Sequence, residues 1–477
     1  MAHNLKTERL TPLDTIMPRT YIRAFLVFRV ANTGDAALKK LRAGLDLLAK
    51  QVPWLCGRVV SVCPDANKAA SFEIQWGPCE NTLNMADKGS TTVSYKAFCM
   101  DGMQPTAIPD SVWPMPDMAG NDLTAPGAPI FDASVFRFAG DEGIGLCICL
   151  HHNVVDAFGF AEIAKLWARN MDSPERLTPI PTRDGPDRLR RHLSSDLEIA
   201  SSKSLDALFA SHPEYSRIPP NLPSKFHPCV CKVFGIPVSQ VQSIKNQLSG
   251  LTSTTPTTNA VVCALIWSAI TRSRARRNPN LLNQTSRLVT AVNGRPRINA
   301  DLSGEGEPFL ANLVLYAMAA IPASDLDVST EKGRTRVLAK ICDAISQSQA
   351  HSQINSRSIG EVYNLVERAG HHGNIHVGWD LFNSQDLTIT GWSDLDLYQA
   401  DFGVGLGKPD CVRVPCSQAD GVSLILPRRR SASTNDGSEV VEIMIMLRDD
   451  DMNVLEDVWD NLLVGEHHVT IEARAET

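Results

Sequence analysis

Residues 150–159 read LHHNVVDAFG, and within this stretch Asp156 follows His152 by four positions. The apolar segment 145–150 precedes the pair and predicts a buried strand. Small residues and apolar positions at helical spacing follow it over 157–167, which predicts a helix. Reactive side chains of α/β proteins often lie where a strand opens into a helix. The stretch therefore predicts both an α/β fold and a candidate catalytic histidine.

The chemistry of this pair centres on the imidazole of His152. Imidazole is the side chain most readily poised to accept a proton near neutral pH. The carboxylate of Asp156 could orient that ring or hold the backbone that carries it, and the sequence leaves both roles open. A second pair with this spacing, His376 and Asp380, lies in a Gly- and His-rich stretch without a strand–helix frame. About one such pair is expected by chance, so we favour His152.

A second motif, DFGVGLGKP, occupies residues 401–409. It fails the phosphate-loop pattern, because Phe402 stands where glycine is needed and Pro409 where serine or threonine is needed. The glycine spacing also differs from that of the dinucleotide fingerprint. We interpret these glycines as allowing a tight turn or a close backbone approach.

Bulk properties exclude several classes of protein. A chain of 477 residues predicts two domains, and a net charge of −7 gives no reason to expect a nucleic-acid partner. The 12 cysteines include no CxxC pair, so we expect reduced thiols and no metal site. The first 25 residues lack the apolar core of a signal peptide, and no apolar run is long enough to span a bilayer. We expect a cytoplasmic protein with no membrane partner.

The composition divides the chain into two units. Strands are predicted over 21–30 and 131–138, and a helix over 36–51. From 171 to 228 prolines recur among charged residues, which predicts a linker with one short helix around Leu197–Phe209. A second unit then begins with a strand over 229–234 and continues with helices from about 238 and after 258.

The two motifs, in this order, resemble those of the BAHD family of acyl-CoA-dependent acyltransferases. The stretches LTPLD (10–14), VPWLCGRV (52–59), VNGRPR (292–297) and EIMIML (442–447) resemble other family segments. The opening region 10–28 is similar to fungal, trichothecene 3-O-acetyltransferase-like members. Three departures stand out: Val404 replaces the family's usual tryptophan, Ala311 precedes Asn312 where glycine is common, and Ala157 follows Asp156 where glycine is frequent.

The resemblance implies the fold and the domain organisation. The fold class is α/β, with two similar chloramphenicol-acetyltransferase-like domains, each a mixed β-sheet flanked by helices. We expect an N-terminal half over 1–172, a long crossover linker over 173–228 and a C-terminal half over 229–477.

The resemblance also implies direct acyl transfer from acyl-CoA to an acceptor, with His152 as the general base and no acyl-enzyme. Asp156 would support the site by pairing with Arg295. Thr390 and Trp392, in the segment TITGW (388–392), would line the channel and stabilise the oxyanion.

Supporting roles fall on two further groups of residues. Asp401, Gly403 and Gly405 would form a structural turn away from the reacting atoms. Hydroxyl groups at a predicted helix N-terminus could meet CoA phosphates, with N-capping as the alternative. These hydroxyls belong to Ser253, Thr254, Thr257 and Thr258.

Two rival functions stay open: an amide-forming enzyme like the condensation domain of a peptide synthetase, and a catalytically silent relative that only binds a ligand. We expect a monomer that uses acyl-CoA, most simply acetyl-CoA, as cosubstrate and has no permanently bound cofactor. The expected acceptor is a hydroxyl group on a specialised metabolite such as a terpenoid.

Overall fold

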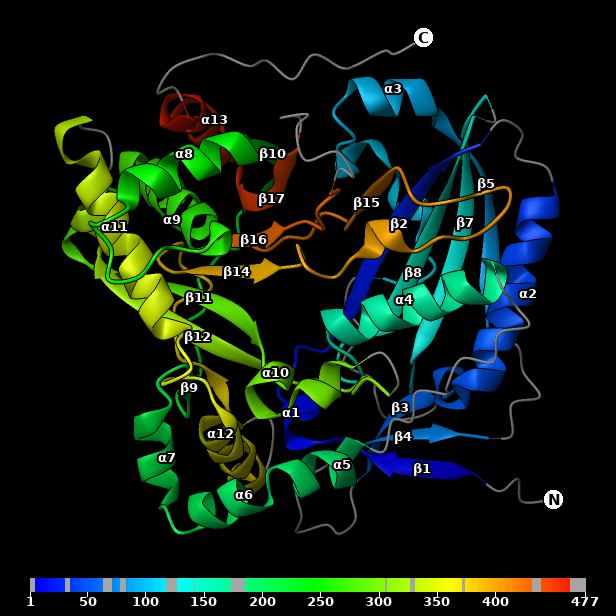
Figure 1. Ribbon diagram of the computed structural model, residues 1–477, viewed down its shortest axis with the longest axis horizontal. Helices are drawn as coiled ribbons and strands as arrows, with labels where there is room; N and C mark the ends of the chain where they lie inside the picture. The colour runs from blue at the N-terminus through cyan, green and yellow to red at the C-terminus, as the bar shows by residue number, and fades with distance from the viewer. Residues whose placement is uncertain are drawn as a thin grey trace.

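The apolar segment before His152 forms β8 (Gly143–His151), and every residue of this strand is buried. An unbroken apolar run fits this position, because a strand with one face in water alternates polar and apolar residues. In the computed structural model, β8 lies at the middle of a five-stranded sheet (Figure 1). The strand order is β15 (Cys411–Arg413), β2 (Tyr21–Arg29), β8, β7 (Phe131–Ala139) and β5 (Met85–Ser94).

The structure describes residues 5–30, 35–62, 71–77, 83–116, 127–140, 142–172, 185–304, 307–326, 331–370, 374–430 and 439–463. The first part of the predicted linker, 173–184, lies outside these ranges.

Helices cover one face of the first sheet and an aromatic cluster covers the other. On the first face α2 (Asp35–Gln51) packs on α4 (Ala157–Asp172), and the indole of Trp167 donates to the carbonyl of Leu41 at 3.0 Å. On the second face, Phe25 and Phe136 pack with residues of α3 (Tyr95–Met100) and its neighbours. A smaller sheet follows the order β1 (Lys6–Arg9), β4 (Ser71–Trp76), β3 (Arg58–Val62) and β6 (Ala128–Pro129).

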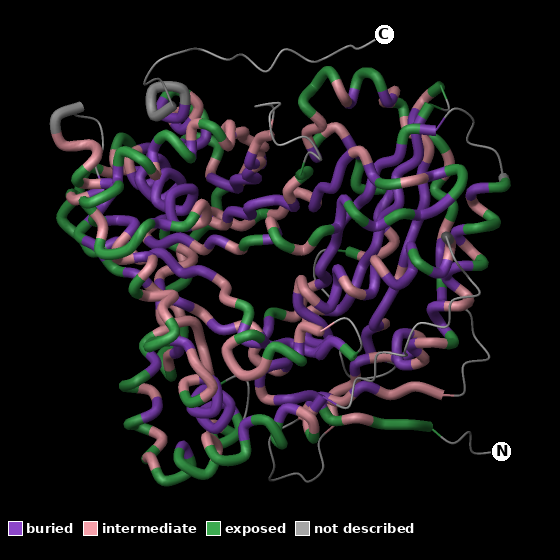
Figure 2. The backbone as a smooth tube through the Cα atoms, in the orientation of Figure 1, coloured by how far each residue is buried: buried purple, intermediate pink, exposed green. Residues whose placement is uncertain are grey.

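The second half contains a six-stranded sheet. Its order is β10 (Cys229–Pro237), β17 (Val440–Arg448), β16 (Val422–Ile425), β14 (Leu387–Gly391), β11 (Thr285–Asn293) and β12 (Val314–Pro322). Four helices cover one face: α8 (Val238–Leu248), α9 (Thr258–Arg277), α11 (Glu331–Ser348) and α13 (Asp449–Leu463). Every residue of α9 from Ala260 to Thr271 is buried, so this helix lies inside the second half rather than on its surface (Figure 2).

Both larger sheets are mixed, as predicted. In the first, β5 pairs with β7 in parallel while the other pairs are antiparallel. In the second, β14 is parallel to both β11 and β16. The prediction of two mixed sheets flanked by helices is confirmed.

The predicted linker is more helical than the sequence indicated. Its described part holds α5 (Gly185–His192), α6 (Ser194–Ser201) and α7 (Leu205–Ser211), followed by β9 (Tyr215–Ser216), which pairs with β13 (His376–Val377). The prediction of one helix around 197–209 was wrong, because Ser204 interrupts it and caps α7 by accepting from the backbone N–H of Ala207 at 3.1 Å. These helices pack against α12 (Ser356–Ala369).

The chain crosses between the two sheets after β14. Beyond Gly391 it runs to the first half and forms β15, where Val412 pairs with Leu26 of β2. It then returns to the second sheet as β16, next to β14. Residues 392–421, here called the crossing segment, therefore join the two halves.

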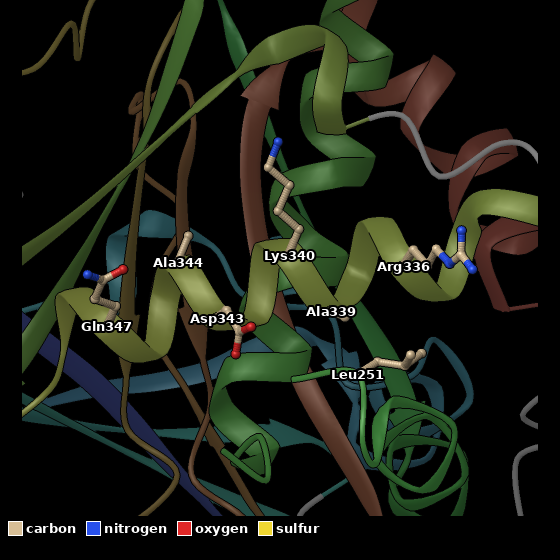
Figure 3. A pocket seen from close by; sticks show the side chains of 7 residues that line it. All are labelled: Leu251, Arg336, Ala339, Lys340, Asp343, Ala344 and Gln347. Carbon is tan, nitrogen blue, oxygen red and sulfur yellow. The ribbon is translucent and has the colours of Figure 1, made fainter. Parts of the chain in front are cut away.

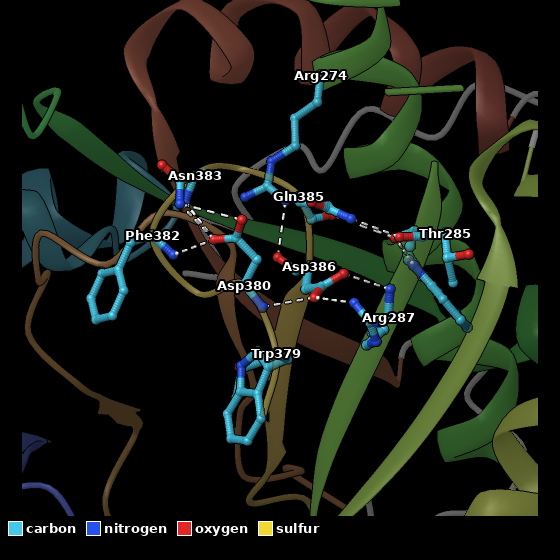
Figure 4. Close-up of polar contacts among 12 residues, drawn as sticks. Arg274, Thr285, Arg287, Trp379, Asp380, Phe382, Asn383, Gln385 and Asp386 are labelled. Atoms are coloured by element: carbon cyan, nitrogen blue, oxygen red, sulfur yellow. Dashed lines mark hydrogen bonds and ion pairs between the residues drawn. The ribbon is translucent and has the colours of Figure 1, made fainter. Parts of the chain in front are cut away.

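A buried carboxylate fixes the start of β14. Asp386 accepts hydrogen bonds from the backbone N–H groups of Arg287 and Asp380, each at 2.8 Å, and pairs with the Arg287 guanidinium at 3.3 Å (Figure 4). Burial raises the pKa of Asp386, and these hydrogen bonds act in the opposite direction. The network holds β14 beside β11, in the register that places Thr388 and Thr390.

Candidate active site

His152 lies in the turn between the end of β8 and the start of α4. Its backbone is held on both sides: its N–H donates to the carbonyl of Thr20 at 2.9 Å, and its own carbonyl accepts from Nδ2 of Asn312 at 2.8 Å. Its side chain is half-buried, whereas the neighbouring His151 is fully buried against Tyr21. His152 is therefore less buried than its neighbour His151.

The surroundings of His152 favour the neutral imidazole. Burial lowers the pKa of His152, and this effect outweighs its own backbone carbonyl, the negative charge of Asp156 and the side chain of Asn312, which raise the pKa. Nδ1 is buried and, among the described residues, has no hydrogen-bond partner in another residue. A neutral ring can accept a proton, as a general base must.

Asp156 is fully occupied by partners other than the His152 ring. Its carboxylate makes a two-point ion pair with the Arg295 guanidinium, at 2.9 and 3.0 Å. It also accepts from the backbone N–H groups of Gly159 and Leu313, each at 3.0 Å. Both side chains of the pair are buried. Asp156 thus ties the first turn of α4 to the second half of the molecule.

Arg295, at the start of α10 (Arg295–Ile298), uses all of its donors. A guanidinium carries five N–H groups, and each one finds an acceptor here. The acceptors are the carboxylate of Asp156, the side chain of Asn293 and the carbonyls of Phe309 and Ala311. The ring of Phe158 lies 4.3 Å from its charged carbon. A buried cation this well paired is a structural anchor.

Sequence reasoning missed a second buried network beside the first. Asp14, in α1 (Pro12–Thr15), accepts from both the backbone and side-chain N–H groups of Asn312 at 2.9 Å. Asn312 in turn holds the His152 carbonyl, and Asn153 donates to the carbonyl of Asp14 at 2.7 Å. LTPLD resembles a family segment and Ala311 before Asn312 departs from one, and neither resemblance predicts this contact. A polar residue inside an apolar run, such as Asn312 within 309–315, was the available signal.

The segment predicted for the oxyanion comes close to the helix that follows His152. Thr390 is half-buried on the face of β14 opposite Ile389, which packs under the helices. Trp392 is 5% exposed and its ring lies 5.8 Å from that of Phe160 in α4. Its backbone N–H donates to the carbonyl of Ile425 at 2.8 Å. The end of β14 therefore packs against α4.

Two of the four hydroxyls proposed for CoA, those of Ser253 and Thr257, already have structural partners. Thr257 caps α9 by accepting from the backbone N–H of Ala260 at 3.0 Å, the alternative that the sequence left open. Ser253 is held by Asp343, which accepts from its backbone N–H at 2.9 Å. Thr254 is exposed and Thr258 is half-buried.

An open groove runs beside these hydroxyls, along α11. Its volume is about 550 Å³ and its lining carries both charges, with Asp343 between Lys340 and Gln347 (Figure 3). Lys340 is itself paired with Asp325 at 2.6 Å. The N-terminus of α9 lies close to the end of β14. A Cβ atom added at Gly391 would lie 3.7 Å from Oδ1 of Asn259.

The glycine motif forms a tight turn packed on the first half. Gly403, Gly405 and Gly407 all have positive φ, and the carboxylate of Asp401 accepts from the backbone N–H of Gly403 at 2.9 Å. Phe402 is buried, with its ring 5.1 Å from that of Phe28. Val404, at the position of the family's tryptophan, is 85% exposed.

The other pair with this spacing has a local structural role. Asp380 accepts from the backbone N–H of Asn383 at 2.9 Å and so closes its own turn, while His376 is half-buried in β13. Within the described residues, three or more His, Cys, Asp or Glu side chains nowhere gather in a way that could hold a metal ion. Nor does any described helix combine the length and apolar character needed to cross a membrane.

Comparison with known proteins adds to this geometry. A sequence model of the Transferase family matches residues 115–462, and one for the trichothecene 3-O-acetyltransferase-like N-terminal domain matches residues 20–170. The chain is 24% identical to trichothecene 8-O-acetyltransferase of Fusarium sporotrichioides, over 94% of this chain and 96% of that protein. It is 23% identical to O-acetyltransferase ptmV of Penicillium ochrochloron, over 94% and 95%.

Solved structures show the same fold. The crystal structure of F. sporotrichioides TRI101 complexed with coenzyme A and T-2 superimposes with a TM-score of 0.76 at 16% sequence identity, covering 94% of this chain and 97% of that one. This agreement confirms the predicted two-domain α/β architecture.

Proposed function

Because the chain belongs to the Transferase family, the BAHD acyltransferases, we propose that it moves an acyl group from acyl-CoA to a hydroxyl group of a specialised metabolite, with His152 as general base. The family match confirms the resemblance inferred from the two motifs, and the chain is an acyl-CoA-dependent O-acyltransferase. Acetyl is the proposed acyl group and a terpenoid the proposed acceptor, since similar proteins are named for acetylation of trichothecenes.

One observation carries the mechanism: a half-buried histidine at the end of β8 whose backbone is held on both sides and whose pKa is lowered by burial. In the proposed reaction, Nε2 of His152 takes the proton of the acceptor hydroxyl as its oxygen bonds to the thioester carbon. The tetrahedral intermediate then loses the CoA sulfur, which takes the proton back from His152. The acyl group passes directly, and no acyl-enzyme forms.

The remaining residues have supporting roles in this proposal. The hydroxyl of Thr390 and the indole N–H of Trp392 would donate to the oxyanion. Asp156 and Arg295 would hold the His152 turn, and the turn at Asp401, Gly403 and Gly405 would hold the crossing segment.

We further propose that CoA approaches from the N-terminus of α9, near Asn259 and Gly391, where backbone N–H groups favour phosphate. Ser253, Thr254, Thr257 and Thr258 stay candidates for that contact, although the partners of Ser253 and Thr257 weaken their case. We also propose that the chain divides into halves at 1–172 and 229–477, joined by the linker 173–228. The protein would act as a monomer in the cytoplasm, without nucleic-acid or membrane partners.

The test is an incubation of the purified protein with acetyl-CoA and a panel of hydroxylated terpenoids and phenolics, following free CoA and product mass. We expect acceptor-dependent release of CoA with an equivalent amount of acetylated product. Intact mass of the protein incubated with acetyl-CoA alone should show no acetyl-enzyme.

The alternatives predict other results. Product formed only from amine acceptors would favour the condensation-like enzyme. Acetyl-CoA binding without release of CoA for any acceptor would favour the silent relative and contradict the proposal.

A further inference from the structure

Two thiols meet where the crossing segment returns to the second sheet. Cys231 lies on β10 and is buried, and Cys416 lies just beyond β15 and is half-buried. Cys416 packs against the core cluster that contains Cys231, and the two thiols are close enough to hydrogen-bond. The proposed acyl transfer uses neither thiol, so this pair is a separate feature of the fold.

The neighbours of Cys416 hold it against β10. The hydroxyl of Ser417 donates to Sδ of Met446 at 3.1 Å, and Met446 is the cross-strand partner of Cys231. The side-chain amide of Gln418 makes two hydrogen bonds to the backbone of Cys229, accepting at 2.8 Å and donating at 3.1 Å. Ser417 and Gln418, the two residues after Cys416, thus bind β17 and β10, and these contacts hold the Cys416 thiol near Cys231.

The two cysteines differ in acidity and access. The hydrogen bond to Cys416 and burial raise the pKa of Cys231, whereas the same hydrogen bond lowers the pKa of Cys416. Cys416 is also the more exposed of the two. A thiolate is the reactive form of cysteine, so Cys416 is the expected nucleophile and Cys231 the resolving thiol.

We propose that Cys231 and Cys416 form a reversible disulfide when the protein meets a peroxide. The Cys416 thiolate attacks a peroxide oxygen, the O–O bond breaks, and one water leaves from hydrogen peroxide. The sulfenic acid so formed is attacked by the Cys231 sulfur, which releases a second water as the S–S bond forms. Two thiols are oxidised and one peroxide is reduced.

The bond would fasten the crossing segment to β10. That segment leaves the second sheet after β14, pairs with β2 in the first sheet and comes back beside Cys231. Oxidation would therefore restrain the joint between the two halves without touching His152.

The experiment treats the full-length protein with hydrogen peroxide, alkylates the free thiols and maps the peptides by mass spectrometry. We expect a Cys231–Cys416 cross-linked peptide that disappears after reduction with dithiothreitol. Cys416→Ser should leave Cys231 reduced and alkylated after the same treatment. Cys231→Ala should leave Cys416 trapped as sulfenic acid, detectable with dimedone, with no disulfide.

Cys263 and Cys342 provide the matched control, because they are neighbours that are both buried. They should stay reduced at peroxide concentrations that cross-link the proposed pair. The proposal is overturned if Cys231 and Cys416 both remain alkylated after peroxide, or if Cys263 and Cys342 cross-link equally well.

Discussion

At the scale of single residues, His152 and Asp156 have separate tasks. The sequence left open whether the carboxylate orients the ring or holds the backbone. In the structure, the carboxylate of Asp156 binds the Arg295 guanidinium and two backbone N–H groups. Its contacts therefore hold the backbone and do not orient the His152 ring. The sequence could indicate a histidine and a carboxylate at the right spacing, but the direction of each side chain depends on Arg295, 139 positions away.

Changing Asp156 should therefore cost stability first. Asp156→Asn leaves the Arg295 cation buried without its counter-charge, and breaking a buried ion pair in this way costs about 3–5 kcal/mol. We expect the free energy of unfolding in urea to fall by about that amount. As a control, Asp394→Asn removes an exposed partner of Arg430 and should cost about 0–1 kcal/mol. Equal losses in the two variants would contradict the anchoring role.

The acid limb of activity should report the environment of His152. A base works only when unprotonated, and burial lowers the pKa of His152 below its ordinary value of 6.5. As pH falls, kcat/KM should therefore hold until below pH 6.5 and then decline. Measuring kcat/KM against pH, with circular dichroism to exclude acid unfolding, checks this. An acid limb centred above pH 6.5 would show that the ring is not desolvated as described.

At the scale of elements, the glycine motif and the helices illustrate what local sequence can predict. The strand before His152 and the helices α2, α8 and α9 follow from local apolar patterns. The glycine turn follows from composition, since only glycine adopts positive φ without strain. The helices of the linker were underestimated, because their apolar residues pack on α12, which is distant in sequence.

The turn should tolerate change at its exposed position and not at its glycines. Gly405 has φ of 110°, so Gly405→Ala forces an alanine into a conformation that costs on the order of 1–3 kcal/mol. Val404→Ala, one residue away on an exposed side chain, should change the unfolding free energy by no more than about 0.5 kcal/mol. Thermal and urea unfolding of the two variants measure these free energies. If Val404→Ala lowered the unfolding free energy as much as Gly405→Ala does, Val404 would have to pack on the rest of the protein.

At the scale of the whole molecule, the two halves pack against each other and are also linked by the crossing segment, which runs from the second sheet to the first and back. Strand β15 comes late in the sequence and belongs to the first sheet. Hydrophobic residues of the crossing segment pack in the core of the first half. No local pattern could predict that β15 joins the first sheet. A three-residue strand carries little sequence signal, and its partner β2 lies near the other end of the chain.

A buried arginine connects the two sheets. Arg413 of β15 pairs with Glu442 of β17 at 2.6 and 2.9 Å and donates to the carbonyl of Met103 at 2.9 Å. Glu442→Gln should lower the unfolding free energy by about 3 kcal/mol, because it leaves Arg413 buried without its counter-charge. The more exposed pair of Lys232 with Glu456 provides the control, and Glu456→Gln should cost about 0–1 kcal/mol.

The wild-type protein should unfold in urea as one unit, because the halves share a core and the crossing segment adds strand β15 to the first sheet. The transitions followed by circular dichroism and by tryptophan fluorescence should therefore coincide. Two separate transitions would mean that the crossing segment does not couple the halves.

The central claim, that His152 is the base for acyl transfer, is tested most directly by the rate of CoA release in His152→Ala with acetyl-CoA and an accepted alcohol. His376→Ala, the histidine of the other pair, is the matched control. The account predicts that His152→Ala loses about 10²–10⁴-fold in kcat with an unchanged circular dichroism spectrum, while His376→Ala keeps the wild-type rate. A folded His152→Ala variant that retains the wild-type kcat would contradict it.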